Sequence, residues 1–389
     1  VGFLRTAPGP TFWIIFYLIA DSGHIWPYTA SNAAVPLAAA LLGHLPGPLD
    51  DALVRNLGYA IFLAAFVPLI FGGKVYNAVE RLMVVKVFSV LGYLLVIDLV
   101  LVSGRVWLAI FSGFFKFGSL PQGEIDWATL AAFAAVAGVG GLGNTTFSNY
   151  ARDKGWGMGP LVGAIPSLVR GRKISLSHTG KVFPITAANL ERWRGWLRHI
   201  RRDQLWVWGL GSLLGMALPS MLSLEFLRGA DVQGHAAAAM TARGIADRHG
   251  EIFWFSTLLC GFFVLGVGFP QTLDSIVRRW TDVLWSASGN LRSREGRQVK
   301  NVYYFVLLGY CLWGLLALRL TPNPLFLAIV SSVVGNIGLG TAALHTLYVN
   351  RRLMPNELRP PWYLQLGLVA GFVFFFGISG FALYQYLES

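Results

Sequence analysis

The chain has 389 residues, of which 55% are hydrophobic and only 13% are charged, with two cysteines and a formal net charge of +12. Soluble domains carry about 25% charged residues, so a water-soluble fold of this size has no room for so much apolar surface. The composition predicts a polytopic membrane protein, and it excludes a disulfide scaffold and an extended disordered chain.

Nine segments are apolar and long enough to cross a bilayer as helices, which takes about 20 residues. Their apolar runs are continuous rather than alternating, which favours helices over barrel strands. We therefore expect a single all-α membrane domain covering residues 1–389, with a short interfacial or re-entrant segment at 105–117. The expected spans are residues 11–43, 57–72, 82–103, 127–150, 205–227, 251–274, 302–320, 324–349 and 361–387.

Basic residues are unevenly distributed between the segments that join these spans. If the first span runs outward from the cytoplasm, 23 basic residues fall in cytoplasmic loops and seven on the outer side, as the positive-inside rule requires. Eleven lie in the basic loop 151–204, where residues 189–202 predict an amphipathic helix at the inner surface. This distribution accounts for the net charge. We therefore expect the lipid bilayer as a partner, and neither nucleic acid nor an obligate protein partner.

The first expected span contains a carboxylate and an imidazole, Asp21 and His24, followed by Pro27. The spacing of three residues places both side chains on one helix face, and an intramembrane carboxylate usually lines a cavity or a proton path. We therefore expect both residues on a proton or water path, with a helix kink near Pro27. In the alternative, His24 only satisfies Asp21 and locks two helices together.

The fourth expected span is rich in glycine and then in polar residues. Four glycines between 138 and 143 make a continuous helix unfavourable. Interrupted helices in transporters expose backbone carbonyls and amides to substrate at mid-membrane depth. Small-residue helix packing is the alternative, but it does not explain the polar run of Asn144, Thr145, Thr146, Ser148 and Asn149. We expect a broken helix, with a substrate site formed by Gly140, Gly141, Leu142, Asn144 and Thr145.

Weaker polar patches occur in two later spans. Ser332 and Asn336 lie among glycines in the eighth span, and Gln271 and Asp274 close the sixth beside a proline. Interhelical hydrogen bonding explains these patches as well as substrate binding does. The sequence has no phosphate-binding Gly-Lys-Ser/Thr loop, no His-Glu-x-x-His zinc motif and no Gly-x-Ser-x-Gly elbow. We therefore expect neither ATP-driven transport nor an enzyme, and no cofactor.

The motif Ile-Ala-Asp-Ser-Gly-His within residues 12–43, the polar stretch 139–149 and four further stretches occur in an order that resembles a known family. This is the natural resistance-associated macrophage protein (NRAMP) family of divalent-metal transporters, in particular its divergent prokaryotic relatives. The first stretch resembles the family's third helix, where Asp is followed three residues later by Glu; Asp21 matches and His24 replaces the Glu. The further resembling stretches are residues 76–95, 152–159, 278–285 and 358–362.

The resemblance implies a LeuT-like inverted-repeat fold in which the nine spans correspond to helices three to eleven of eleven. On this alignment the first two helices are missing, and the chain is expected to be an N-terminally truncated fragment. The family's sixth helix normally offers Met-Pro-His, whereas Leu142, Gly143 and Asn144 stand there in this sequence. Carbonyl, amide and carboxylate oxygens suit magnesium, calcium or manganese, and the sulfur ligand that favours softer metals is gone.

The function that the resemblance implies is secondary transport of a divalent cation across the cytoplasmic membrane of a prokaryote, coupled to protons. Magnesium or manganese is expected rather than iron or cadmium. The expected metal ligands are the Asn144 amide and the Gly141 carbonyl, and the binding region also includes Ser332 and Asn336. The expected proton or water path comprises Asp21, His24, Asn149 and Arg152. Two alternatives stay open, namely a LeuT-like transporter of an amine or amino acid, and a non-transporting membrane sensor or degenerate homologue.

Overall fold

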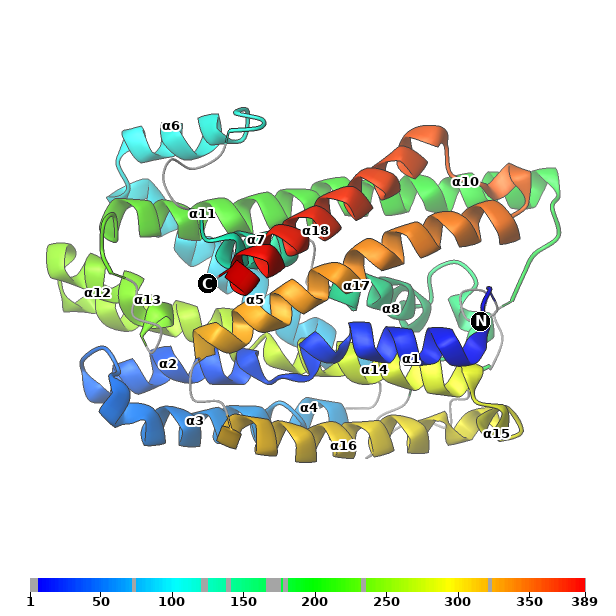
Figure 1. Ribbon diagram of the computed structural model, residues 1–389, viewed down its shortest axis with the longest axis horizontal. Coiled ribbons are helices and arrows are strands. Elements are labelled where there is room, and N and C mark those ends of the chain that lie inside the picture. Colours follow the sequence, from blue (N-terminus) through cyan, green and yellow to red (C-terminus); the bar gives the residue numbers. More distant parts are fainter. Residues whose placement is uncertain are drawn as a thin grey trace.

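The computed structural model describes residues 6–71, 75–119, 125–137, 141–165, 176–177, 181–231, 236–320 and 324–388. It is 83% helix, with no strand among the residues described. Seven helices in these ranges are long and apolar enough to cross a membrane. The long helices run roughly along one common direction (Figure 1). This is the architecture of an all-helical polytopic membrane protein.

Five of the expected spans correspond to apolar helices close to their predicted bounds. The second is bent after Ala64, where two turn residues precede Val67. The helices that form these five spans are α3 (Asp51–Ala64) with α4 (Val67–Ile70), α5 (Val75–Leu101), α16 (Val299–Leu320), α17 (Pro324–Leu353) and α18 (Trp362–Glu388).

The fifth expected span is longer than predicted. It consists of α11 (Leu210–Phe226), which a π-helical turn at Asp203–Gly209 joins to α10 (Ala187–Arg202). The amphipathic helix predicted at 189–202 is therefore present, but it continues along the axis of α11 instead of forming a separate surface helix (Figure 1). No proline lies in the connecting turn, so nothing in the sequence ends the helix there.

The sixth expected span also continues beyond its predicted end at Asp274. Helix α13 (Glu251–Leu265) is followed after a short turn by α14 (Phe269–Ala287), and together they form one apolar unit, Glu251–Ser286. The loop predicted from residue 278 onward is therefore wrong in its first part. Arg278 and Arg279, counted above among the cytoplasmic loop residues, are buried side chains of α14. Their charges are tolerated because buried carboxylates pair with them.

The two remaining spans, the first and the fourth, are both interrupted. The first consists of α1 (Pro10–Ala20), a 3-10 turn η2 (Ser22–Ile25) and α2 (Tyr28–Leu42), so the kink expected near Pro27 is a complete break. The fourth consists of α7 (Trp127–Ala137), a 3-10 turn η4 (Gly141–Thr145) and α8 (Thr146–Lys154). Residues 138–140 lie outside the described ranges. The break expected in this span is therefore present, although its described part is a tight 3-10 turn.

Shorter helices complete the fold. Helix α6 (Gly104–Gly113) lies where a short interfacial or re-entrant segment was expected, and it packs mainly against α11 (Figure 1). Helix α12 (Ala237–His249) was not expected, because its sequence is too polar for a span. The others are α9 (Gly159–Val162), α15 (Gly289–Arg292) and the 3-10 turns η3 (Pro48–Asp50), η6 (Gly296–Gln298) and η7 (Asn356–Leu358).

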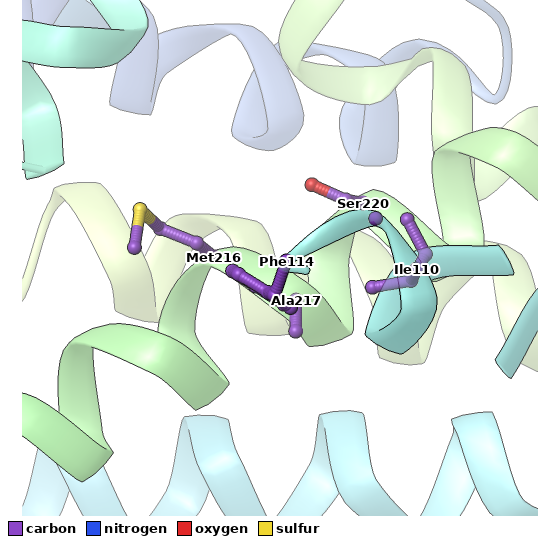
Figure 2. Close-up of a pocket in the computed structure, with 6 residues that line it drawn as sticks. Ile110, Phe114, Met216, Ala217 and Ser220 are labelled. Carbon is purple, nitrogen blue, oxygen red and sulfur yellow. The ribbon is translucent and has the colours of Figure 1, made fainter. Parts of the chain in front are cut away.

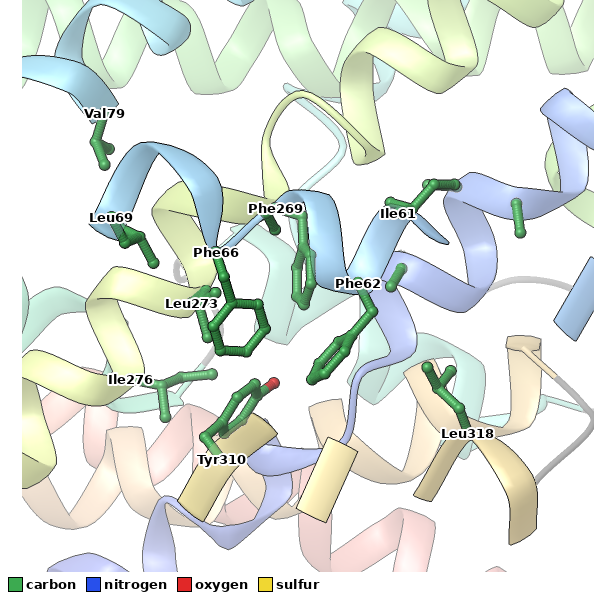
Figure 3. Close-up of a cluster of buried hydrophobic side chains, with 14 of the residues drawn as sticks. Ile61, Phe62, Phe66, Leu69, Val79, Phe269, Leu273, Ile276, Tyr310 and Leu318 are labelled. Atoms are coloured by element: carbon green, nitrogen blue, oxygen red, sulfur yellow. The ribbon is translucent and has the colours of Figure 1, made fainter. Parts of the chain in front are cut away.

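An aromatic core fixes the position of α14 relative to α3 and α16. The ring of Phe62 lies 5.2 Å from that of Phe66, 5.8 Å from Phe269 and 5.9 Å from Tyr310 (Figure 3). Gly314 of α16 allows this approach, because a Cβ atom there would lie 2.2 Å from the Phe62 ring. The apolar face of α14 is thus held against α3 and α16, while other residues of α14 contact α1 and α8.

Candidate functional site

The first break places a carboxylate at the end of a helix inside the bundle. The last α-helical bond of α1 runs from the Asp21 amide to the Tyr17 carbonyl, and the His24 amide then donates to the Asp21 carbonyl at 2.9 Å. Pro27 offers no backbone N–H, and α2 begins directly after it. Carbonyl oxygens at the C-terminal end of a helix carry partial negative charge, so the Asp21 carboxylate needs a cation nearby.

Arg279 of α14 is that cation. Its Nε donates to Asp21 Oδ2 at 3.1 Å and its Nη2 donates to Asp21 Oδ1 at 2.8 Å. The indole N–H of Trp280 donates to Oδ2 at 2.9 Å. His24 lies close by, with its Nδ1 3.4 Å from Asp21 Oδ1. The sequence pattern thus brings Asp21 and His24 together, but Arg279 makes the closer contacts with the carboxylate.

The second break is tied to the same arginine. Thr146, the first residue of α8, is buried and shares a 2.7 Å hydrogen bond with Ser275 of α14. Arg279 Nη1 donates to both hydroxyls, at 3.2 Å to Thr146 Oγ1. One guanidinium therefore bridges the end of α1 and the beginning of α8. The two interrupted spans meet here, although 125 residues separate Asp21 from Thr146 in the sequence.

The residues predicted to bind substrate at the second break divide into two groups. Leu142 is buried, whereas Asn144 and Thr145 are exposed. The Thr145 hydroxyl donates to the Leu142 carbonyl at 2.7 Å, which stabilises the 3-10 turn. Gly141 is the first residue of that turn, and Gly140 lies outside the described residues. This turn therefore presents an amide and a hydroxyl at the surface of the break.

Helix α17 packs against both breaks. It approaches the first backbone to backbone, because a Cβ atom on Gly23 would lie 2.8 Å from the Ser331 carbonyl oxygen. Asn336 is fully buried and donates to the Ala131 carbonyl of α7 at 2.8 Å, while Ser332 is half-buried. In its described contacts Asn336 therefore forms an interhelical hydrogen bond, which is the alternative to substrate binding that the sequence left open for this patch.

Asn149 and Arg152, predicted on a proton or water path, belong to a second polar cluster. Arg152 Nη1 donates to Asn149 Oδ1 at 3.2 Å, and its Nε donates to Asp153 at 3.0 Å. Asp153 also accepts from Arg278, whose Nε donates to Asp274 at 2.7 Å. The Tyr303 hydroxyl donates to Asp274 at 2.6 Å. The described contacts of Asn149 and Arg152 thus lie around Arg278 rather than around Asp21.

The donor set was tested for a metal site. No group of three or more His, Cys, Asp or Glu side chains suited to a metal ion occurs among the described residues. Around the breaks the available ligands include the Asp21 carboxylate, the Asn144 amide, the hydroxyls of Thr145 and Thr146, backbone carbonyls and the His24 imidazole. All but the imidazole are oxygen ligands. Such a set suits a hard cation that keeps part of its water shell, and it lacks the sulfur that softer metals prefer.

A separate apolar groove lies between α6 and α11, with a volume of about 270 Å³. Figure 2 shows the residues that line it, Ile110 and Phe114 from α6 and its C-terminal end and Met216, Ala217 and Ser220 from α11. Ser220 offers the groove its hydroxyl, and no charged side chain lines it. A groove of this composition does not suit a cation, so the candidate site is the junction of the two breaks.

Sequence reasoning missed Arg278, Arg279, Ser275 and Trp280. The polar residues of α14 did contain a usable pattern. Gln271, Asp274, Ser275, Arg278, Arg279 and Asp282 recur at spacings of three and four residues. That periodicity is typical of one polar helix face, and it argues for a helix that continues past Asp274. What it cannot give is the partner of each arginine on distant helices.

No family model matches the sequence, and no curated protein matches it.

Proposed function

We propose that the chain is a secondary transporter whose substrate site lies between the two interrupted spans. The observation that carries this proposal is the agreement of three features. Of the nine expected spans, the first and the fourth are the two that contain no helix of membrane-spanning length among the described residues, both breaks contact α14 and α17, and a buried carboxylate lies at the junction. Interrupted helices paired in this way form the substrate sites of many secondary transporters.

The charge of the site favours a cation as substrate. Asp21 adds a full negative charge to the negative end of α1, and the hydroxyls and the amide nearby offer further oxygen ligands. The resemblance to NRAMP transporters and the absence of sulfur from the set described above support a divalent cation, magnesium or manganese rather than cadmium or iron. The finer parts of the proposal are a LeuT-like fold, residence in a prokaryotic cytoplasmic membrane, and proton coupling through Asp21 and His24.

One observation favours the amine alternative. The group bound to Asp21 in this structure is an organic cation, the guanidinium of Arg279. Aromatic side chains lie around this guanidinium. Trp280 donates to the same carboxylate, Asp21, and Tyr28 and Tyr310 are near enough to Arg279 to interact with it electrostatically. Aromatic rings attract organic ammonium ions through cation–π contacts. A small amine is therefore the second candidate substrate.

Competitive uptake into proteoliposomes tests these proposals. Manganese accumulation should be inhibited by magnesium, weakly by cadmium, and not by methylammonium. Asn144→Ala should reduce uptake by removing an amide ligand, and Leu142→Met, a change of similar volume, should shift the preference toward cadmium. Inhibition by methylammonium alone would favour the amine candidate. Robust cadmium uptake that neither substitution changes would contradict the assignment of these residues, and no uptake of any cation would contradict the proposed function.

A further inference from the structure

The guanidinium of Arg279 occupies the place that a transported cation needs. It donates to both oxygens of Asp21, and the Trp280 indole donates to one of them. Arg279 and Asp21 are both buried, with side-chain exposures of 7% and 2%. A cation that is to bind the Asp21 carboxylate must therefore first replace a charged hydrogen-bonding partner.

We propose that Arg279 is a built-in counter-cation of the transport site. The substrate cation binds by displacing Arg279 from Asp21, and Arg279 returns when the substrate leaves. This inference rests on the proposed function. It adds that competition from Arg279 sets the affinity of the site for the substrate cation. The arginine is thus a specificity-determining residue that competes with the substrate.

The contacts of Arg279 keep its guanidinium hydrogen-bonded during such an exchange. Its Nη1 already donates to Thr146 and Ser275, on the side of the guanidinium away from Asp21. A small rotation of the side chain can give up the two bonds to Asp21 while these two are kept. Ser275 lies one helical turn before Arg279 on the same helix, so this second anchor does not depend on the position of α1.

The exchange also keeps the buried carboxylate paired at every stage. An unpaired buried charge is strongly destabilising, whereas here either Arg279 or the substrate neutralises Asp21. Monovalent alkali ions are disfavoured, because they offer the carboxylate the same charge as Arg279 without its two directed hydrogen bonds. A divalent cation offers twice the charge. Competition from Arg279 therefore lowers the affinity of the site for every cation and excludes cations that bind the Asp21 carboxylate only weakly.

The test is manganese binding to the purified full chain, measured by calorimetry for wild type, Arg279→Lys and Arg279→Gln. Without the competing charge, Arg279→Gln should bind manganese about tenfold more tightly than wild type. Arg279→Lys should lie between the two, because a lysine ammonium is a point charge that cannot hold a carboxylate through two parallel bonds. A purely structural role for Arg279 predicts the reverse order, since removing it would then only loosen the site.

Two controls accompany these variants. Arg243→Gln removes an arginine of α12 that pairs with Asp247, remote from the breaks, and should leave the affinity unchanged. The double variant Asp21→Asn/Arg279→Gln removes both charges and should not bind manganese.

If Arg279→Gln does not fold, the direction in which Arg279→Lys changes the manganese affinity decides. If wild type binds manganese and the Arg279 variants bind it equally or more weakly, this inference is overturned and the proposed function still stands. No cation binding by any folded variant would overturn both.

Discussion

Arg278 and Arg279 are neighbours on α14, yet their surroundings differ in the balance of charge. Arg278 is completely buried between two carboxylates, Asp153 and Asp274, while Arg279 has one carboxylate partner, Asp21. Successive residues on a helix point about 100° apart, so Arg278 reaches Asp153 within α8, whereas Arg279 reaches the end of α1 and the first residue of α8. The two side chains thus hold different sites on the neighbouring helices to α14.

This difference separates a structural ion pair from an exchangeable one. In the Arg278 cluster each acid has a second partner, because Arg152 also binds Asp153 and the Tyr303 hydroxyl also binds Asp274, so losing one contact leaves others in place. The Arg279 pair is one to one, and it lies where two interrupted helices meet. Neighbouring residues of the same type on one helix can therefore serve different purposes, which partner geometry rather than residue type reveals.

The largest expected effect comes from removing the structural arginine. Arg278→Gln would leave Asp274 buried without its cation and Asp153 with Arg152 alone, and breaking a buried pair in this way costs about 3–5 kcal/mol. Thermal unfolding of the detergent-purified variant should show a large loss of stability, greater than that of Arg279→Gln in the presence of manganese. Equal stability of the two variants with manganese bound would contradict the distinction between the two arginines.

A smaller effect should follow from separating α17 from the first break. A Cβ atom at Gly23 would lie 2.8 Å from the Ser331 carbonyl oxygen and 3.0 Å from Val334 Cβ. Gly23→Ala should therefore destabilise the protein by about 1–3 kcal/mol through overpacking. Gly92→Ala is the matched control, because Gly92 lies within α5 with open space around it, and alanine there should be neutral or stabilising. Similar losses in both variants would show that the contact with α17 is not the cause.

The smallest effect concerns an acid with no arginine partner. Asp126 precedes α7, and its carboxylate accepts hydrogen bonds from the Thr129 hydroxyl and the Thr129 amide. These bonds, the hydroxyl first, lower the pKa of Asp126 below its ordinary value of 3.8. A lowered folded-state pKa means that the contribution to stability is fully present above the ordinary pKa and is lost as pH falls below it.

Asp126→Ala should cost about 1 kcal/mol at neutral pH, as expected for a helix cap. The difference from wild type should shrink as the pH falls below 3.8. Stability of the two proteins measured by urea titration at several pH values checks this. A difference that stays constant with pH would mean that the charge of Asp126 does not matter.

Composition and hydropathy were sufficient to predict the helical membrane class and the approximate positions of the seven described helices that are long and apolar enough to cross a membrane. Glycines and polar residues at 138–149, and Pro27 after Asp21, also predicted where two helices are interrupted, because these residues disfavour a continuous helix. The end of α14 was predicted too early, since charged residues end a hydropathy window even when their charges are paired inside the protein. Here one polar face continues through Arg278 and Arg279.

The partners within the candidate site were not predictable from local sequence. Asp21 and Arg279 are 258 residues apart, and nothing in a single sequence pairs them. His24 was the partner that local spacing suggested for Asp21, and it lies at 3.4 Å. The bidentate bond from Arg279 is the stronger contact, and it follows only from the way α14 packs against α1.

Locating a bound cation tests the central claim most directly. Crystals of the full chain grown with manganese allow the metal to be placed from its anomalous scattering. The account predicts one strong peak between the Asp21 carboxylate and the turn Gly141–Thr145, with the Arg279 guanidinium moved from Asp21 toward Thr146 and Ser275. Manganese found elsewhere in the membrane-spanning helices, with the Asp21–Arg279 pair intact, would contradict it.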